Sequence, residues 1–157
     1  MSSMQPPFDE ATAYHEAGHA IVALALGRPI HRVSVLPNRD RLGICEFRKG
    51  VFRPTKDWLE EQILISFGGL AAEARRTGKY SWAEASHDLR YIRQLTKKRA
   101  GDRQAERLEN RLLAKTENML ADEQLWKAVE VVAAELILHG IISGRAVRHL
   151  FEECCKE

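Results

Sequence analysis

Residues 13–20 read Ala13-Tyr14-His15-Glu16-Ala17-Gly18-His19-Ala20 and contain the pattern H-E-x-x-H. On an α-helix each residue turns by about 100°, so His15 and His19 lie roughly 40° apart and about one turn along the same face. Two imidazole nitrogens placed in this way can bind one ion at about 2.0–2.1 Å. The segment therefore predicts a helix that presents two ligands to Zn²⁺.

Glu16 directly follows His15 and is expected to lie beside it without being a ligand itself. Zinc lowers the pKa of a bound water toward about 7, and a nearby carboxylate can take the proton of that water as it attacks a carbonyl. The same carboxylate can pass the proton to the leaving amine. The pattern thus indicates hydrolysis of a peptide bond with Glu16 as general base and no covalent acyl-enzyme. The competing interpretation is an exposed His-Glu-His face that holds no ion.

The flanking residues predict the ends of this helix and a close neighbour. Asp9 suits the positive end of a helix, and Gly27 suits the residue just past its other end. Gly18 inside the helix costs about 1 kcal/mol relative to Ala, which indicates that another element approaches closely there. Gly68 and Gly69 weaken a second predicted helix in the same way, so we expect the two helices to pack against each other.

Beyond this helix the hydrophobic spacing changes from alternating to helical. Alternation predicts a strand at 30–36 and a returning strand at 42–47, joined by a turn at 37–40. Helical spacing follows, with breaks near 101–102 and 121–122. It predicts helices at about 58–76, from between 81 and 87 to 99, 104–120, 125–140 and 143–151. This order predicts an α+β fold that is mostly α, with one small β-hairpin.

Length and composition indicate an ordinary globular protein. The 157 residues suffice for one domain, and we expect residues 1–157 to form a single domain with a flexible segment at 1–7. Hydrophobic residues make up 45% and charged residues 29% of the chain, as is usual for globular proteins. The 24 basic and 22 acidic residues give a net charge of +2. This balance gives no general attraction to nucleic acid or to an anionic membrane.

Targeting and redox features point to a cytoplasmic location. The longest uncharged apolar run, residues 20–26, is far shorter than the roughly 20 residues of a membrane span. The first residues lack the basic region and apolar core of a signal peptide. Cys45, Cys154 and Cys155 form no disulfide framework, so reduced thiols are expected.

A catalytic zinc site needs a third protein ligand, with its fourth position left to water. A pattern with a third histidine six residues after His19 is excluded because that position is Ala25. Spacing alone does not choose among the remaining candidates, which are Glu73, Asp88, His87, Glu84, His31, His139 and His149.

Five segments, in order between about residues 11 and 150, resemble the peptidase domain of the FtsH family of zinc metalloproteases. These segments are His15-Glu16-Ala17-Gly18-His19-Ala20, Arg32-Val33-Ser34-Val35-Leu36-Pro37 with Leu42-Gly43, Gly68-Gly69-Leu70-Ala71-Ala72-Glu73, Ala85-Ser86-His87-Asp88-Leu89, and Ala134-Glu135-Leu136 through Ile142-Ser143-Gly144. The aspartate of the fourth segment is the family's third zinc ligand. The resemblance thus implies a zinc site of His15, His19 and Asp88, with Glu16 as base.

Two further roles are expected around this site. Glu73 could accept a hydrogen bond from a ligating histidine, because such ligands usually bind an outer partner through their other nitrogen. The strand at 42–47, through Gly43, Ile44 and Cys45, could bind a peptide substrate as an added strand. The alternative interpretations are that Glu73 is an ordinary surface glutamate and that the strand at 42–47 is only an internal hairpin edge.

The sequence also departs from the family. It contains no G-x-x-x-x-G-K-[ST] pattern, so we expect activity that does not depend on ATP. Ser81 and Glu84 form a capping-box pattern that could start the third helix early. His87 stands where the family has a polar amide, and it could contact substrate or simply be exposed. The basic stretch between residues 90 and 107 is interpreted as a solvated helix face rather than an RNA site.

Together these features predict an ATP-independent zinc metalloendopeptidase that acts on unfolded polypeptides or peptides. We expect neither a nucleic-acid nor a membrane partner, and either a homo-oligomer or a separate ATPase chain as a protein partner. The alternative is a metal- or peptide-binding adaptor or regulatory module with a peptidase-like fold.

Overall fold

The computed structural model describes residues 8–37, 43–47, 57–82 and 85–156. Within these residues the elements, in chain order, are α1 (Glu10–Ala25), β1 (Ile30–Ser34), β2 (Ile44–Phe47), α2 (Trp58–Thr77), α3 (Ser86–Leu120), α4 (Glu123–His139), β3 (Ile141–Ser143) and α5 (Gly144–Cys154). The predicted α+β architecture, mostly α, is confirmed. The flexible segment expected at 1–7, most of the turn at 37–40, and Glu84 lie outside the described residues.

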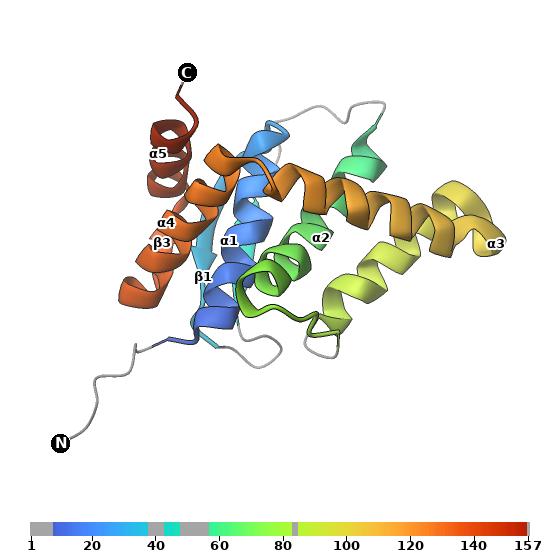
Figure 1. Ribbon diagram of the computed structural model, residues 1–157, viewed down its shortest axis with the longest axis horizontal. Coiled ribbons are helices and arrows are strands. Elements are labelled where there is room, and N and C mark those ends of the chain that lie inside the picture. Colours follow the sequence, from blue (N-terminus) through green and yellow to red (C-terminus); the bar gives the residue numbers. More distant parts are fainter. Residues whose placement is uncertain (1–7, 38–42, 48–56, 83–84, 157) are drawn as a thin grey trace.

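Helix α1 is the central element of the molecule. Its N-cap is Asp9, whose carboxylate accepts a hydrogen bond from the Thr12 backbone N–H at 3.0 Å. At its other end Gly27 adopts the positive φ of 80° that a side chain would disfavour. Between these ends α1 contacts α2, α4 and the sheet, and Figure 1 shows it enclosed by them. Most of its residues are therefore buried.

Helices α1 and α2 cross at a contact between two glycines. A Cβ at Gly18 would lie 2.2 Å from the Gly68 carbonyl oxygen, and a Cβ at Gly68 would lie 2.8 Å from the Gly18 carbonyl oxygen. The two backbones therefore touch directly, as the sequence led us to expect. This crossing fixes the position of α2 against the buried side of α1.

The sheet is antiparallel, with strand order β2-β1-β3. In its register Val33 of β1 lies between Cys45 of β2 and Ile142 of β3. The predicted hairpin is present, but both strands are shorter than expected, and β3 was not predicted. Three residues are too few for an alternating pattern, and Ser143 is equally the N-cap of α5, where its hydroxyl accepts from the Ala146 N–H at 3.1 Å.

Helix α3 is a helical hairpin rather than one straight rod (Figure 1). Gly101 has φ 74° and ψ 172°, and it separates residues 86–100 from residues 102–120. The two halves are joined by Glu109, which accepts hydrogen bonds from Arg93 at 2.6 Å and from the Thr96 hydroxyl at 2.6 Å. The break predicted at 101–102 is thus confirmed, whereas α3 begins at Ser86, at the late end of the predicted range.

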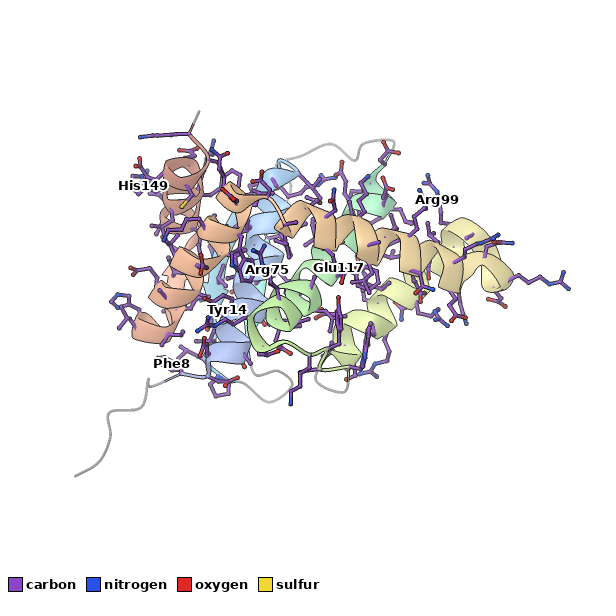
Figure 2. The ribbon with its side chains drawn as sticks, in the orientation of Figure 1. Phe8, Tyr14, Arg75, Arg99, Glu117 and His149 are labelled. Atoms are coloured by element: carbon purple, nitrogen blue, oxygen red, sulfur yellow. The ribbon has the colours of Figure 1, made fainter. Side chains whose placement is uncertain are left out.

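Aromatic and basic side chains join α1, α2 and α4. The Tyr14 ring lies 5.7 Å from the Trp126 ring, and the Arg75 guanidinium lies 4.2 Å from the centre of that ring. Figure 2 shows Tyr14 and Arg75 in this region, in front of α1. Among the helices of the described ranges, none combines the length and apolar character needed to cross a bilayer.

Candidate metal centre

Three side chains from two helices meet at one point. His15 and His19 come from α1, and Asp88 comes from the first turn of α3. Asp88 Oδ2 lies 2.8 Å from His15 Nε2 and 3.3 Å from His19 Nε2. The ligand atoms of the three residues all lie within 4.8 Å of one another. The helical spacing of the two imidazoles and the arrival of α3 together assemble the cluster.

This cluster fits a zinc ion in donor type and in separation. Two imidazoles and one carboxylate are the nitrogen and oxygen donors that catalytic zinc sites use, with a fourth position left open. Donors about 2.0–2.1 Å from a tetrahedral ion lie roughly 3.3 Å from one another. The observed separations to Asp88 of 2.8 and 3.3 Å are close to that spacing. Small side-chain adjustments would let the three groups share one ion.

Mutual attraction in a buried setting shifts the ionisation of all three groups. Burial raises the pKa of Asp88, but the His19 and His15 imidazoles outweigh it and hold that pKa well below its usual range. Burial lowers the pKa of His15, yet hydrogen bonds with Asp88 and Glu73 raise it to about 10. The pKa of His19 is also raised, because Asp88 outweighs the effect of burial. The carboxylate is thus kept ionised, as a metal ligand must be.

Helix α2 orients both imidazoles through contacts with their Nδ1 atoms. The His19 Nδ1–H donates to the carbonyl oxygen of Ile65 at 2.7 Å, and His15 Nδ1 lies 3.6 Å from Glu73 Oε1. Glu73 is only 3% exposed. In both rings Nε2 is therefore turned toward Asp88 and Nδ1 toward α2, which fixes the ring orientation. Sequence reasoning singled out Glu73 but missed Ile65, since a backbone carbonyl carries no residue-type signal.

Gly69 provides the space that the two rings occupy. A Cβ at Gly69 would lie 2.6 Å from His19 Nε2 and 2.8 Å from His15 Cδ2. These separations are shorter than van der Waals contact, so any larger residue would displace the rings. The two glycines predicted to allow close packing thus lie against different groups, Gly68 against the α1 backbone and Gly69 against the His15 and His19 rings.

A cleft of about 710 Å³ opens over the cluster. Its floor holds the three clustered side chains together with Glu16, which is 7% exposed. Gly43 and, from β2, Cys45 and Phe47 line one part of it, and the start of α3 lines another. Ile44 is not among the lining residues, because successive side chains of a strand point to opposite faces. Glu16 therefore shares one solvent-accessible space with the cluster.

Strand β2 borders the cleft and lies at one edge of the described sheet. It pairs with β1 alone among the described strands, so its other edge faces away from the sheet. A Cβ at Gly43 would lie 3.0 Å from the Glu16 Cγ, so this glycine leaves room for the Glu16 side chain. Burial raises the pKa of the Cys45 thiol well above its usual value, with Glu16 adding to the effect. Cys45 is accordingly a neutral wall residue.

Of the other candidate third ligands, Glu73 faces His15 Nδ1 at 3.6 Å, and the other described histidines are not part of the cluster. His87 lines the cleft but is not part of the cluster, and His139 pairs with Glu135 at 3.2 Å on α4. His31 borders a separate cavity, and His149 is exposed on α5. Glu84 lies outside the described residues. Among the described candidates, Asp88 is the one that the fold brings to both histidines.

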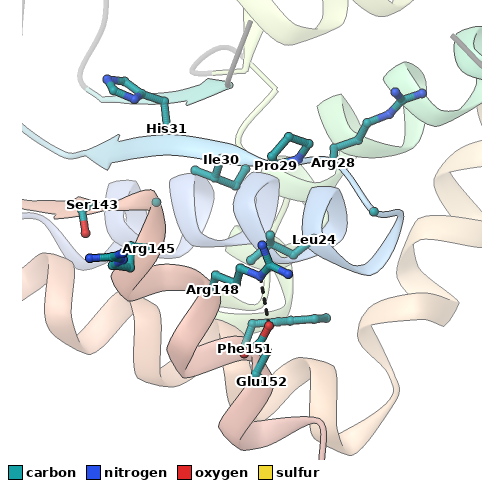
Figure 3. A pocket seen from close by; sticks show the side chains of 12 residues that line it. Leu24, Arg28, Pro29, Ile30, His31, Ser143, Arg145, Arg148, Phe151 and Glu152 are labelled. Atoms are coloured by element: carbon teal, nitrogen blue, oxygen red, sulfur yellow. Dashed lines mark hydrogen bonds and ion pairs between the residues drawn. The ribbon is translucent and has the colours of Figure 1, made fainter. Parts of the chain in front are cut away.

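That separate cavity, also of about 710 Å³, lies between the end of α1, the start of β1 and α5 (Figure 3). Leu24 and Phe151 line it, and Arg148 donates to Glu152 at 2.9 Å across its edge. No metal-ligating cluster was found there among the described residues. It therefore lacks the grouping of reactive side chains that marks the cleft over His15 and His19.

Comparison with known proteins gives consistent matches. The model of peptidase family M41 matches residues 3–102, a range that contains His15, Glu16, His19 and Asp88. The ATP-dependent zinc metalloprotease FtsH of Marinobacter nauticus is 30% identical over 104 residues, which is 64% of this chain and 16% of that protein. The FtsH of Cupriavidus metallidurans is 44% identical over 70 residues, which is 41% of this chain and 10% of that protein. FtsH 3 of Sorangium cellulosum is 41% identical over 83 residues, which is 50% of this chain and 14% of that protein. The matched part of the chain thus spans only 10–16% of the length of these relatives.

Proposed function

The chain belongs to peptidase family M41, and on that premise we propose that it is a zinc metallopeptidase with His15, His19 and Asp88 as ligands and Glu16 as general base. The relatives named above are zinc metalloproteases by name. The observation that carries the assignment to these residues is the cluster itself, with its ligand atoms within 4.8 Å of one another. Its substrates are accordingly peptides or proteins.

The arrangement supports a one-step hydrolysis. His15, His19 and Asp88 would hold the zinc ion, which would supply Lewis-acid polarisation of the scissile carbonyl and lower the pKa of a water molecule toward about 7. Glu16 accepts the proton of the attacking water at its carboxylate and returns it to the leaving nitrogen. A C–O bond forms, the C–N bond breaks, and the products are a carboxylate and an amine.

The remaining residues hold the reacting groups in place. Glu73 and the Ile65 carbonyl keep the imidazoles oriented, and Gly69 leaves them room. The open edge of β2 beside Gly43 and Cys45 is suited to bind an extended substrate through main-chain hydrogen bonds. Such bonds are independent of substrate side chains, which favours broad recognition of unfolded polypeptides.

We also infer that the chemical step needs no nucleotide. Hydrolysis of a peptide bond is exergonic, and each proton transfer above is assigned to Glu16. ATP dependence is part of the names of relatives that are several times longer than this chain. The zinc-loaded chain is therefore expected to cleave unfolded casein without ATP, and at a rate that added ATP does not change.

The decisive experiment compares Glu16→Gln with Glu135→Gln, a matched change at an exposed glutamate on α4. Removing a general base typically slows a reaction by about 10²–10⁴-fold. Glu16→Gln should lose peptide cleavage to that extent and keep its zinc, whereas Glu135→Gln should behave as the unmodified chain. Equal cleavage by both variants would refute the proposed function. Retained zinc and peptide binding with no cleavage by any form would favour the adaptor alternative.

A further inference from the structure

The first half of α3 extends from the cleft and carries basic residues along one face. Arg90 lines the cleft, as do Tyr91 and Gln94. At 100° per residue, Lys97 lies about 20° from Arg90 around the helix, and Lys98 about 20° from Tyr91. These two lysines therefore continue the cleft-lining face by roughly two turns. We call Arg90, Lys97 and Lys98 the basic track.

Neighbouring acids leave much of this positive charge uncompensated. Arg93, outside the track, is paired with Glu109 at 2.6 Å. Lys97 lies 3.9 Å from Asp102, and both of those side chains are largely exposed. Over the described part of the chain no ion pair is recorded for Arg90 or Lys98, and both are exposed. Two cations of the track are thus available to a ligand.

The track leads outward from the metal centre. The α3 hairpin projects from the rest of the molecule (Figure 1), and Arg99, next to Lys98, lies toward its outer end (Figure 2). Glu16, Glu73 and Asp88 are among the residues that line the cleft. A polypeptide that leaves the cleft along α3 would therefore pass from these acidic side chains to a positive surface.

We propose that the basic track binds acidic side chains of the substrate, so that polypeptides with acidic residues near the cleaved bond are the preferred class. The proposal rests on the proposed function, because it takes the scissile bond to lie at the metal centre. It changes the interpretation of this basic stretch from a solvated face to a substrate-binding one. Charge complementarity and continuity with the cleft are the observations that carry it.

Helix geometry predicts which substrate positions are affected. Lys98 is ten residues beyond Asp88, or about 15 Å along the helix axis. An extended chain advances about 3.3 Å per residue, so an acid roughly four or five residues from the scissile bond would reach Lys98. An acid one or two residues away would reach Arg90. Each exposed ion pair typically gives about 1.4- to 5-fold in affinity.

Nucleic acid is the less suitable occupant. Binding of single strands combines a positive groove with aromatic platforms for successive bases. Tyr91 is the one aromatic side chain on the exposed face of this half of the hairpin. Discrete carboxylates suit two separated cations better than a continuous phosphate backbone does.

The test uses the full zinc-loaded chain and peptides that share one apolar cleavage site. The peptides carry Glu, Gln or Lys one and four residues from the scissile bond, on either side. The track variant is Arg90→Gln with Lys98→Gln. Its control is Lys127→Gln with Arg145→Gln, which removes the same charge at exposed positions of α4 and α5. Cleavage gives kcat/KM, and fluorescence anisotropy on a Glu16→Gln background gives affinity without turnover.

The unmodified chain and the control should favour the Glu peptide over the Lys peptide by about 5-fold, on one side of the scissile bond. The preference should fall toward 1 in the track variant and at 0.5 M salt. An unchanged preference in the track variant overturns the proposal, as does tighter binding of an RNA oligonucleotide than of the Glu peptide. Failure to cleave even the Gln peptide would instead count against the proposed function, and the anisotropy arm would still test the track.

Discussion

Gly69 is the residue whose missing side chain matters most to the metal centre. A methyl group there would lie 2.6 Å from His19 Nε2. The rings can rotate away from it, so we expect Gly69→Ala to fold with little loss of stability, since Ala is also the better helix former by about 1 kcal/mol. Zinc affinity should fall by at least tenfold, because both ligands are displaced. Competition with a chromophoric chelator measures it, and unchanged affinity would contradict the assigned role.

Glu73 lies 3.6 Å from His15 Nδ1, so we propose that it supports the metal site through His15 rather than by direct contact. Outer partners of ligating histidines typically contribute about 10- to 100-fold in metal affinity or activity. Glu73→Ala should lose zinc affinity in that range, while Glu73→Gln, which keeps an acceptor oxygen, should recover part of it. Glu135→Ala on the surface is the control. Equal losses in Glu73→Ala and Glu73→Gln would indicate that burial of the charge, not the contact with His15, sets the effect.

At the scale of elements, the α1–α2 crossing holds the His15 and His19 side chains against α2. Gly18 and Gly68 touch through backbone atoms. The Gly68 carbonyl oxygen lies 2.2 Å from the position that a Cβ at Gly18 would take. Since backbone cannot rotate away as a side chain can, Gly18→Ala must separate the helices. Overpacking of this kind typically costs about 1–3 kcal/mol. Urea denaturation of the metal-free protein should show this loss, and a midpoint equal to that of Gly69→Ala would argue against the distinction drawn here.

The α3 hairpin is closed by a charged contact that titrates. Burial raises the pKa of Glu109, but Arg93 and Thr96 outweigh it, so its folded-state pKa is lowered. The stabilisation is therefore present above the usual glutamate pKa of about 4.3 and is lost as the pH falls through the lowered value. Glu109→Gln should be less stable than the unmodified chain at pH 7, and the difference should shrink by pH 3. A difference independent of pH would contradict this account.

Several features could be predicted from local sequence because their causes are local. The ends of α1 follow from Asp9 and Gly27, and the break in α3 follows from Gly101. Strand β3 could not be predicted, since its three residues form a strand only where β1 offers an edge. Edge pairing is a property of the assembled sheet.

The residues of the candidate site also divide into those that local sequence predicts and those that depend on tertiary folding. His15, Glu16 and His19 could be proposed from spacing within one helix. Asp88, 69 residues beyond His19, was reached only through family resemblance, because tertiary folding brings it to the histidines. The support from the Ile65 carbonyl and the space left by Gly69 depend on how α2 lies against α1. Neither is encoded in a residue pattern.

At the scale of the whole molecule, the proposed zinc ion would join helices that are distant in the chain. Its ligands come from α1 and α3, while α2 supports them, so binding should stabilise the folded chain as a unit. We propose that the described residues form one domain and unfold in one transition. Far-UV circular dichroism and the fluorescence of the three tryptophans, which are Trp58 on α2, Trp82, and Trp126 on α4, should then give coincident curves.

Zinc at about 100 times its dissociation constant should add about 2.7 kcal/mol. For a chain of this size that corresponds to a rise in Tm of roughly 5–10 °C. The rise should disappear in a His15→Ala, His19→Ala double variant, which loses two of the three ligands. An equal rise in that variant would place the bound zinc elsewhere. Separate transitions for circular dichroism and fluorescence would show instead that the chain does not unfold as one cooperative unit.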